Sequence, residues 1–500
     1  MCHLTHQLPT PLDVKESTIS NASFGHRPNL SQAPLLAVIA VACLALSAAL
    51  GGLPIEVGAA LVVAISVFIL CFISTEVSLM VLVFSMLLSP EFGTGGLTDT
   101  TGATADRGVT IRTEDLLLLV MAFAWITRMA VHKELGLLRI TALNRPIAYY
   151  VAVCVLATGL GIVFGHVTGV TAFFFVMKYV EYFVIYFVVA NNIHSRSQIK
   201  RFTLAMLVTA VIVCFVAMAQ LPGGGRVAAP FEGEHGEPNT LGGYLLFISA
   251  LVGGLLTQVK DRGRRMWLWA LLVLMIMPFL ATLSRGSYLA APFVYGAFVV
   301  LNKSLRARVV MIVALVGFVT LGAVVMPQTV VDRIAYTWEQ GKTSHARVQV
   351  GQVKLDSSTS ARLNSWKEAL SDSFDSPIWG FGVTGYKFLD AQYPRILVET
   401  GLLGVVTFGA LLTAILRETY RVYKGATDPL FKGLATGLLA GTVGLLVHAL
   451  GANTFIIVRI MEPFWLAVGL VISAAGIMRD DGGSREEEVS TNTRVENAAT

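Results

Sequence analysis

Long apolar segments recur along the chain from about residue 33 to residue 478. A helix needs about 17–25 predominantly apolar residues to cross the roughly 30 Å hydrocarbon core of a bilayer. This pattern predicts an all-α, polytopic membrane protein with about fourteen transmembrane helices, the alternative being twelve helices with re-entrant pieces. The predicted spans are 33–52, 57–74, 76–90, 114–131, 147–165, 170–190, 202–221, 240–258, 266–283, 287–302, 309–326, 396–416, 434–452 and 462–478.

Lysine and arginine cluster in the short loops that follow even-numbered predicted spans. Loops rich in these residues stay in the cytoplasm when a membrane protein inserts. The alternation therefore predicts that these loops and both chain termini are cytoplasmic. The basic loops lie at 133–145, 196–201, 260–265, 303–308 and 417–432.

A polar segment at 327–395 interrupts the apolar pattern after the eleventh predicted span. Lipid cannot satisfy the hydrogen bonds of an irregular backbone, so this loop lies in water, and the charge alternation makes it extracytoplasmic. The loop separates a transmembrane bundle at 33–326, with short outer loops, from C-terminal transmembrane helices at 396–478. The N-terminal residues 1–32 and the acidic residues 479–500 are predicted to be disordered cytoplasmic tails.

The composition and the short motifs narrow the partners and cofactors that the protein can use. Hydrophobic residues make up 55% of the 500 residues and charged residues only 14%, with a formal net charge of +5. Because the basic residues follow the membrane pattern, they do not indicate a nucleic-acid partner. There is no phosphate-binding GxxxxGK[ST] motif, and the five cysteines lack the spacing of a metal or redox site. We therefore expect no nucleotide, metal or other cofactor.

Several arginines fall on the predicted outer side, where the orientation rule disfavours them. The guanidinium group binds phosphate through paired hydrogen bonds, so a lipid diphosphate is a fitting partner. Two alternatives stay open: Arg285 caps a helix or reaches the headgroups, and Arg362 packs on Trp366 one turn later. The outer arginines are Arg226, Arg285, Arg333, Arg362, Arg395 and Arg459.

An acidic outer loop precedes the span at 240–258. Its carboxylates and imidazole could hold a divalent metal, recognise sugar hydroxyls or simply face solvent. Their irregular spacing matches no metal motif, so no metal site is assigned. The polar residues of this loop are Glu232, Glu234, His235, Glu237 and Asn239.

Charged and polar groups also occur within predicted spans. Lys178 and Glu181 stand three residues apart, so they form either a structural ion pair or a functional pair. His448 is predicted to be a satisfied core histidine. In the long loop, LNSWKEALSDSF indicates a helix that ends before Pro377. Its apolar stripe is predicted to dock this helix on the membrane domain, and it comprises Leu363, Trp366, Leu370 and Phe374.

Four short motifs occur in a fixed order between about residues 220 and 470. They are Ser284-Arg285-Gly286, Arg362…Trp366, Pro377…Gly380…Gly382 and Tyr393…Glu399…Gly401…Gly404. Together they resemble the O-antigen ligase/Wzy polymerase superfamily. The segments EGEHGEPNTLGGYL and TFIIVRIMEPFW look closest to polymerases of exopolysaccharide repeat units. The resemblance implies a GT-C-like glycosyltransferase of the bacterial inner membrane that uses an undecaprenyl-diphosphate donor at the periplasmic face, without nucleotide and, in the ligase branch, without metal.

In ligases of this superfamily, two arginines that match Arg285 and Arg362 bind the diphosphate. A histidine nine residues before the motif glutamate is the general base, whereas this chain has Asp390 at that position. The difference favours the polymerase branch. The expected activity is therefore inverting polymerisation of lipid-linked oligosaccharide repeat units, with Arg285, Arg362 and Asp390 as catalytic residues. The alternatives are a ligase that moves finished glycan to another acceptor and a lipid-linked oligosaccharide flippase.

Further residues are predicted to contact the donor or the acceptor glycan because they share the outer side with these three. Expected partners are the bilayer, the lipid-linked oligosaccharides, and a chain-length co-polymerase with other polysaccharide export proteins. The substrate-binding candidates are Arg226, Glu232, His235, Asn239, Arg333, Gln392, Tyr393, Arg395 and Arg459.

Overall fold

The computed structural model describes most of the chain between residues 65 and 499. The chain divides into two compact units, Met1–Val63 and Ala64–Thr500, and every described residue belongs to the second. The N-terminal tail, the first predicted span, Glu232, His235 and Arg333 lie outside the described residues. The described ranges are 65–89, 91–93, 110–131, 138–223, 225–230, 236–302, 304–306, 308–313, 316, 330–331, 349–350, 353–354 and 357–499.

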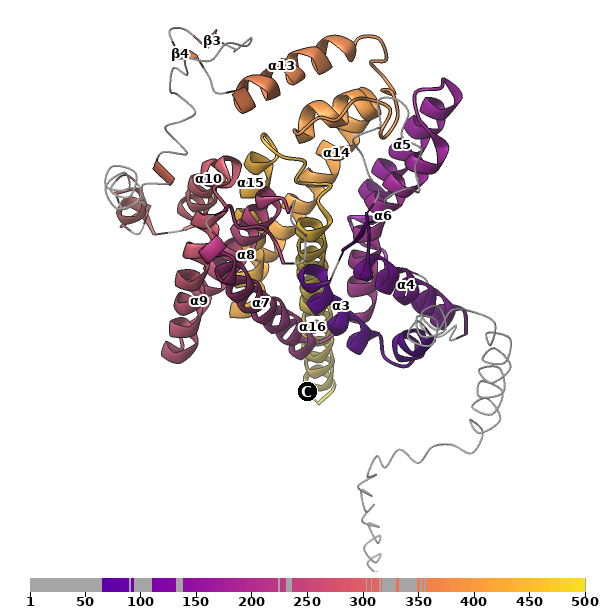
Figure 1. Ribbon diagram of the computed structural model, residues 1–500. Coiled ribbons are helices and arrows are strands. Elements are labelled where there is room, and N and C mark those ends of the chain that lie inside the picture. Colours follow the sequence, from indigo (N-terminus) through magenta and orange to yellow (C-terminus); the bar gives the residue numbers. More distant parts are fainter. Residues whose placement is uncertain are drawn as a thin grey trace, which may run out of the picture. The chain divides into compact units, whose positions relative to one another are not determined.

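Helices dominate these ranges, and two short antiparallel hairpins join them (Figure 1). The hairpins are β1 (Glu91–Gly93) with β2 (Thr110–Arg112), and β3 (Gln349–Val350) with β4 (Val353–Lys354). The helices are α3 (Thr75–Leu88), α4 (Thr113–Val131), α5 (Asn144–Val163), α6 (Gly169–Asn192), α7 (Arg196–Ala219), the 3₁₀ helix η4 (Leu221–Gly223), α8 (Pro238–Gln258), α9 (Arg262–Ala281), α10 (Arg285–Leu301), α13 (Ser357–Asp372), α14 (Gln392–Gly425), α15 (Pro429–His448) and α16 (Val458–Ala499).

The predicted all-helical membrane class agrees with this structure. Predicted spans from 76–90 to 287–302, and from 396–416 to 462–478, each coincide with a helix. Eight helices in the described residues are long and apolar enough to cross a membrane, and α3 and α10 are shorter apolar helices. The count of fourteen is not confirmed. The eight are Asn144–Val163, Ala172–Asn192, Arg196–Gly223, Pro238–Gln258, Arg262–Ala281, Gln392–Gly425, Pro429–His448 and Val458–Asp480.

Among the described helices, α8 and α15 pack most extensively on each other, with α10 and α16 beside them (Figure 1). A Cβ atom added at Gly254 of α8 would lie 2.3 Å from the backbone nitrogen of Gly437 in α15. Glycine is therefore required at this crossing, because only the absence of a side chain lets two membrane helices approach so closely. Helices α10, α14 and α16 also pack against this pair.

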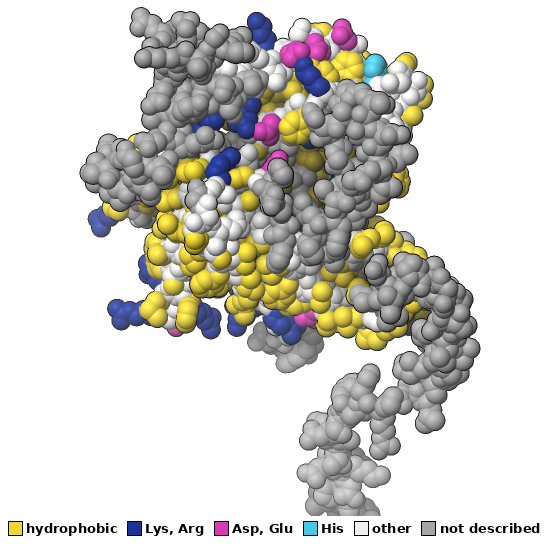
Figure 2. Space-filling view, viewed as in Figure 1, with side chains coloured by type: hydrophobic (Ala, Val, Ile, Leu, Met, Phe, Trp, Pro, Cys, Tyr) yellow, Lys and Arg dark blue, Asp and Glu magenta, His cyan; other side chains and the backbone are white. Residues whose placement is uncertain are grey.

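The basic loops gather at one end of the bundle. Arg196, which begins α7, forms an ion pair with Asp428, which caps α15. The backbone nitrogen of Arg139 donates to Asn191 Oδ1 at the end of α6, at 2.6 Å. The phenol of Tyr423, near the end of α14, donates to the carbonyl of the last residue of α10. On the face shown in Figure 2, lysine and arginine side chains line this end, below a broad hydrophobic zone.

The opposite end joins the glycine-rich part of the long loop to other helix ends. The backbone nitrogen of Val383 donates to Thr158 Oγ1 in α5 at 3.2 Å, and that of Gln392 donates to the carbonyl of Ala449, just after α15, at 3.2 Å. Helix α13 lies beyond the ends of α14 and α15 at this end (Figure 1). Residues far apart in the sequence therefore meet here, as the predicted alternation of loops requires.

Helix α16 extends through the acidic C-terminal residues to Ala499. The predicted disordered tail from residue 479 is instead a continuation of this helix. After Pro463, near the start of α16, no proline follows that would end it, which is compatible with this continuation.

Candidate functional site

Helix α13 docks on the membrane domain through a small side chain. Ala369 is fully buried and packs with Leu389 and Val398. The predicted apolar stripe is wrong in its second half, since Leu370 is 56% and Phe374 76% exposed. A small residue permits close approach of the helix, so the contacting face is turned away from the largest apolar side chains.

The glycine motifs form one backbone unit at a break in α14. Gly401 adopts φ 64° and ψ −167°, a conformation that interrupts the helix and is open almost only to glycine. The backbone nitrogens of Phe381 and Gly382 donate to the carbonyls of Val398 (2.8 Å) and Glu399 (2.9 Å). The two motifs of the resemblance therefore pack against each other, and their glycines hold the loop on the broken helix.

A buried ion pair lies beneath this turn. Arg395 Nε is 3.2 Å from Glu399 Oε2, and both side chains are at most 5% exposed. The backbone nitrogen of Thr384 donates to Glu399 Oε1 at 3.2 Å. Arg395, predicted to contact substrate, thus has a carboxylate partner inside the protein. A buried charge needs such a partner, and with Glu399 held by Arg395 the Thr384 hydrogen bond joins α14 to the loop.

The structure brings together two of the three predicted catalytic residues. Arg362 Nη2 of α13 lies 2.6 Å from Asp390 Oδ2, and each side chain is about a third exposed. Asp390 lies two residues before the first residue of α14, and its neighbour Leu389 is anchored: Asn453 Nδ2 donates to the carbonyl of Leu389 at 2.7 Å. The pair is therefore accessible to solvent on a backbone that is held in place.

Arg285 is the first residue of α10, at the same end of the bundle. Ser284 rather than Arg285 caps the helix, because its Oγ accepts from the backbone of Ser287. Ser284 Oγ also donates to Asn239 Oδ1 at 2.8 Å. Arg226 Nε donates to the carbonyl of Thr282 at 3.0 Å, just before α10. Two predicted substrate-binding residues, Asn239 and Arg226, therefore surround the start of this helix, whose amino end favours anions.

His448 lies at the end of α15, beside the start of α10. Its side chain is fully buried, and its Nδ1 lies 2.8 Å from Thr454 Oγ1. Its Nε2 has no hydrogen-bond partner in the described part of the chain. A Cβ atom added at Gly286 would lie 3.7 Å from His448 Cδ2. The prediction of a satisfied core histidine is thus only half right, since one ring nitrogen stays unpaired beside the start of α10.

The remaining candidates have partners within the protein. Arg459 is fully buried and donates to the backbone carbonyls of Leu87 (3.4 Å), Ser89 (3.2 Å) and Pro230. Tyr393 Oη donates to the carbonyl of Leu446 at 2.6 Å. These contacts assign both side chains a structural task in joining helices.

Gln392 is also fully buried, and its Oε1 accepts from the backbone nitrogen of Phe455 at 3.0 Å. Its amide therefore joins the start of α14 to the loop after α15. Within the described ranges, no three His, Cys, Asp or Glu side chains form a cluster that could hold a metal ion.

Lys178, within α6, has a partner that sequence reasoning missed. It contacts Asp115 of α4 as well as Glu181, the latter at 3.4 Å. No local signal could have identified Asp115, because the two residues are distant in sequence and meet only when α4 packs on α6. The predicted pair is thus part of a three-residue charged cluster that joins two helices.

Comparison with known protein families matches part of this chain. A family model described as O-antigen ligase matches residues 270–409. The matched segment contains Arg285, Arg362 and Asp390, and it ends just after the break at Gly401. No curated protein matches the chain.

Proposed function

We propose that this chain, which belongs through residues 270–409 to the O-antigen ligase/Wzy polymerase superfamily, is an inverting polysaccharide polymerase. In this proposal it joins oligosaccharide repeat units carried on undecaprenyl diphosphate, at the outer face of the bacterial inner membrane. The observation that carries the proposal is the solvent-accessible pair of Arg362 and Asp390, 2.6 Å apart.

Asp390 is proposed as the general base. An acceptor hydroxyl is a weak acid, so it must lose its proton as it attacks, and a positioned carboxylate can take that proton. The ion pair with Arg362 keeps the carboxylate in one orientation. Only one of the five guanidinium N–H donors needs to engage Asp390, which leaves others for a phosphate oxygen. Arg362 can thus hold the base and the leaving group near the same point.

Arg285 is proposed to bind the donor diphosphate together with Arg362. In the reaction, the acceptor oxygen bonds to the anomeric carbon from the side opposite the diphosphate. The bond from that carbon to the diphosphate oxygen breaks, and the hydroxyl proton passes to Asp390. Negative charge grows on the departing diphosphate, and fixed donors aimed at it lower the barrier. A single displacement of this kind inverts the anomeric configuration.

A ligase is the second candidate, because the matching family is described as O-antigen ligase. The two activities differ in their acceptor: a polymerase needs only lipid-linked glycan, whereas a ligase needs a different acceptor lipid or protein. The aspartate at position 390 is the feature that favours the polymerase, since ligases carry histidine there.

The test uses the lipid-linked glycan that accumulates in cells lacking this chain. This material is extracted and incubated with the purified full-length protein in vesicles, and the products are sized on a gel. A ladder of increasing length supports a polymerase. Product formed only after a second acceptor is added would identify a ligase, and unchanged glycan under both conditions would refute glycosyl transfer.

A matched control is available on the same loop. Lys387 and Glu368 also form an ion pair between α13 and the glycine-rich turn, and both are more exposed than Arg362 and Asp390. Lys387→Ala removes an equivalent positive charge from this loop. The proposal expects a normal ladder from Lys387→Ala and none from Arg362→Ala at equal protein levels.

A further inference from the structure

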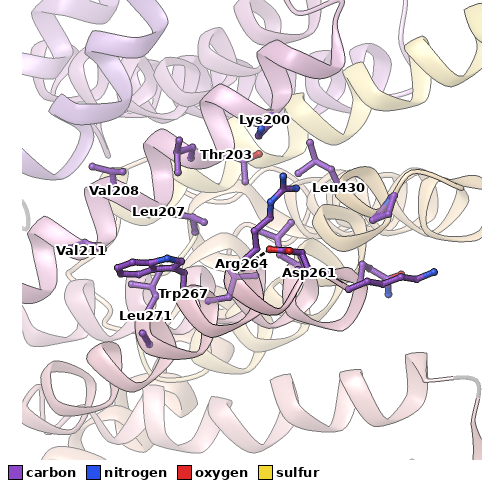
Figure 3. A pocket seen from close by; sticks show the side chains of 18 of the residues that line it. Lys200, Thr203, Leu207, Val208, Val211, Asp261, Arg264, Trp267, Leu271 and Leu430 are labelled. Carbon is purple, nitrogen blue, oxygen red and sulfur yellow. Dashed lines mark hydrogen bonds between the residues drawn. The ribbon is translucent and has the colours of Figure 1, made fainter.

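An apolar groove opens at the basic end of the bundle, away from the proposed active site. Its volume is about 950 Å³, and helices α7 and α9 form its walls. Leu204, Val208 and Phe215 of α7 line one side, and Trp267 and Leu271 of α9 line the other. Val208, Trp267 and Leu271 are labelled in Figure 3. Most of these side chains are exposed, with Trp267 74% accessible. The groove is therefore a lipid-facing feature of the spans rather than a core cavity.

Net positive charge surrounds the mouth of the groove. Lys200, Lys260 and Arg264 line it, and none of them forms an ion pair in the described part of the chain. The two nearby carboxylates are already engaged. Asp428 binds the first residue of α7, and Asp261 caps α9 by accepting from the backbone nitrogen of Arg264 at 2.8 Å. Three cationic side chains without an ion pair among the described residues thus lie at the mouth, with Asp261 as one carboxylate beside them, so the net charge still favours an anion.

The apolar part of the groove has the depth of one lipid leaflet. It runs along α7 from Leu204 to Phe215, which at about 1.5 Å per residue is about 16 Å. Half of a roughly 30 Å hydrocarbon core is about 15 Å. The charged mouth thus lies at the level of headgroups and the apolar walls at the level of acyl chains. The same arrangement is visible in Figure 3, where Lys200 and Arg264 lie at one end of the row of apolar side chains.

We propose that this groove binds a phospholipid with an anionic headgroup from the leaflet at the basic end. Its phosphate contacts Lys200, Lys260 and Arg264, and its acyl chains occupy the walls formed by α7 and α9. The orientation rule explains why positive charge lies at this end, but not why three unpaired cations surround one groove. Phospholipid is the occupant that fits best, because the apolar walls end after one leaflet depth.

The test measures lipid retained by the full-length protein. The protein is incorporated into bilayers of equal parts phosphatidylcholine and phosphatidylglycerol that contain a photoreactive phosphatidylglycerol, and cross-linked peptides are identified by mass spectrometry. We expect labels on α7 and α9 near Leu204 and Trp267. Each basic side chain removed at the surface weakens attraction by roughly fivefold. The double variant Lys200→Gln/Arg264→Gln should therefore lose labelling by roughly 25-fold.

The matched control is Arg262→Gln/Arg265→Gln, which removes the same charge from the first turn of α9 outside the groove lining. It should keep the label. Val208→Trp fills the groove without changing charge and should lose it. Equal loss in control and test variants would refute the site. Displacement of the photoreactive phosphatidylglycerol by equimolar undecaprenyl phosphate would also refute it, as would equal labelling by a photoreactive phosphatidylcholine. A third refuting outcome is cross-links showing that residues 33–63 of this chain occupy the groove.

Discussion

The pairing of Arg362 with Asp390 makes a quantitative prediction that separates catalysis from stability. Three variants are compared: Arg362→Ala, Asp390→Asn and the double variant. The side chains lie 2.6 Å apart but are about a third exposed, so the ion pair contributes only about 0.2–1 kcal/mol to folding. Loss of a general base costs about 10²–10⁴ in rate, and loss of a donor to the leaving group costs about 10²–10³.

The double variant is the informative one. If both side chains act on one transition state, its rate should fall only slightly below that of the slower single variant, because residues that work as a unit are not additive. If they acted independently, the losses would multiply to about 10⁴ or more. The rate is the initial growth of the product ladder from extracted lipid-linked glycan, and stability is the fluorescence melting temperature in detergent. Asp390→Asn at the normal rate would refute the base, and multiplied losses would refute the shared transition state.

Three further predictions concern the turn at Gly401, the charged cluster at Lys178 and the buried His448. Gly401→Ala should destabilise the protein by about 1–3 kcal/mol or more, because alanine is strained at this φ and ψ. The control is Gly409→Ala in the same helix, where the added Cβ atom meets open space, and it should keep the melting temperature of the unchanged protein. Lys178→Met leaves the carboxylates of Asp115 and Glu181 together without a cation, and should lower the melting temperature by an amount equivalent to up to about 3 kcal/mol. Adding Asp115→Asn to this variant should restore part of the lost melting temperature. The amide of His448→Asn can replace only the ring nitrogen that contacts Thr454, so this variant should keep the melting temperature but slow ladder growth roughly tenfold. The amide of His448→Gln reaches the position of the other nitrogen, so this variant should elongate faster than His448→Asn. Equal rates in the two variants would exclude a role for Nε2.

The positions of most helices could be predicted from sequence because bilayer thickness imposes one length on every span. The α5 to α10 helices begin within a few residues of their predictions for this reason. The charge alternation also predicted which loops share an end, and Arg196 with Asp428 shows two of them in contact. Packing within the bundle could not be predicted, since lipid-facing and helix-facing positions are both apolar. The close approach at Gly254 and Gly437 carries no signal that separates it from other glycines.

Residues of the candidate site could be predicted only where they belong to a family motif. The order of the motifs identified Arg362 and Asp390 as candidate catalytic residues, and the structure brings them together. Sequence alone assigned an outward role to Arg395 and Arg459 from sidedness. Both turn inward, because a side chain at a helix end can face either solvent or the bundle. The unpaired nitrogen of His448 gave no signal, as a single histidine in an apolar span has no partner that spacing can reveal.

These inward arginines explain how a loop can carry precise chemistry. The glycine turn alone would be mobile, yet Glu399 holds it through Thr384, and Arg395 neutralises Glu399 from the same helix. The motif glutamate, nine residues after Asp390, is thus buried and cannot itself take a proton from an acceptor in water. Its contacts instead fix the segment from which Asp390 projects. The spacing between the two acidic residues therefore reflects a division of labour, in which one carboxylate holds the backbone and the other, paired with Arg362, remains exposed for the reaction.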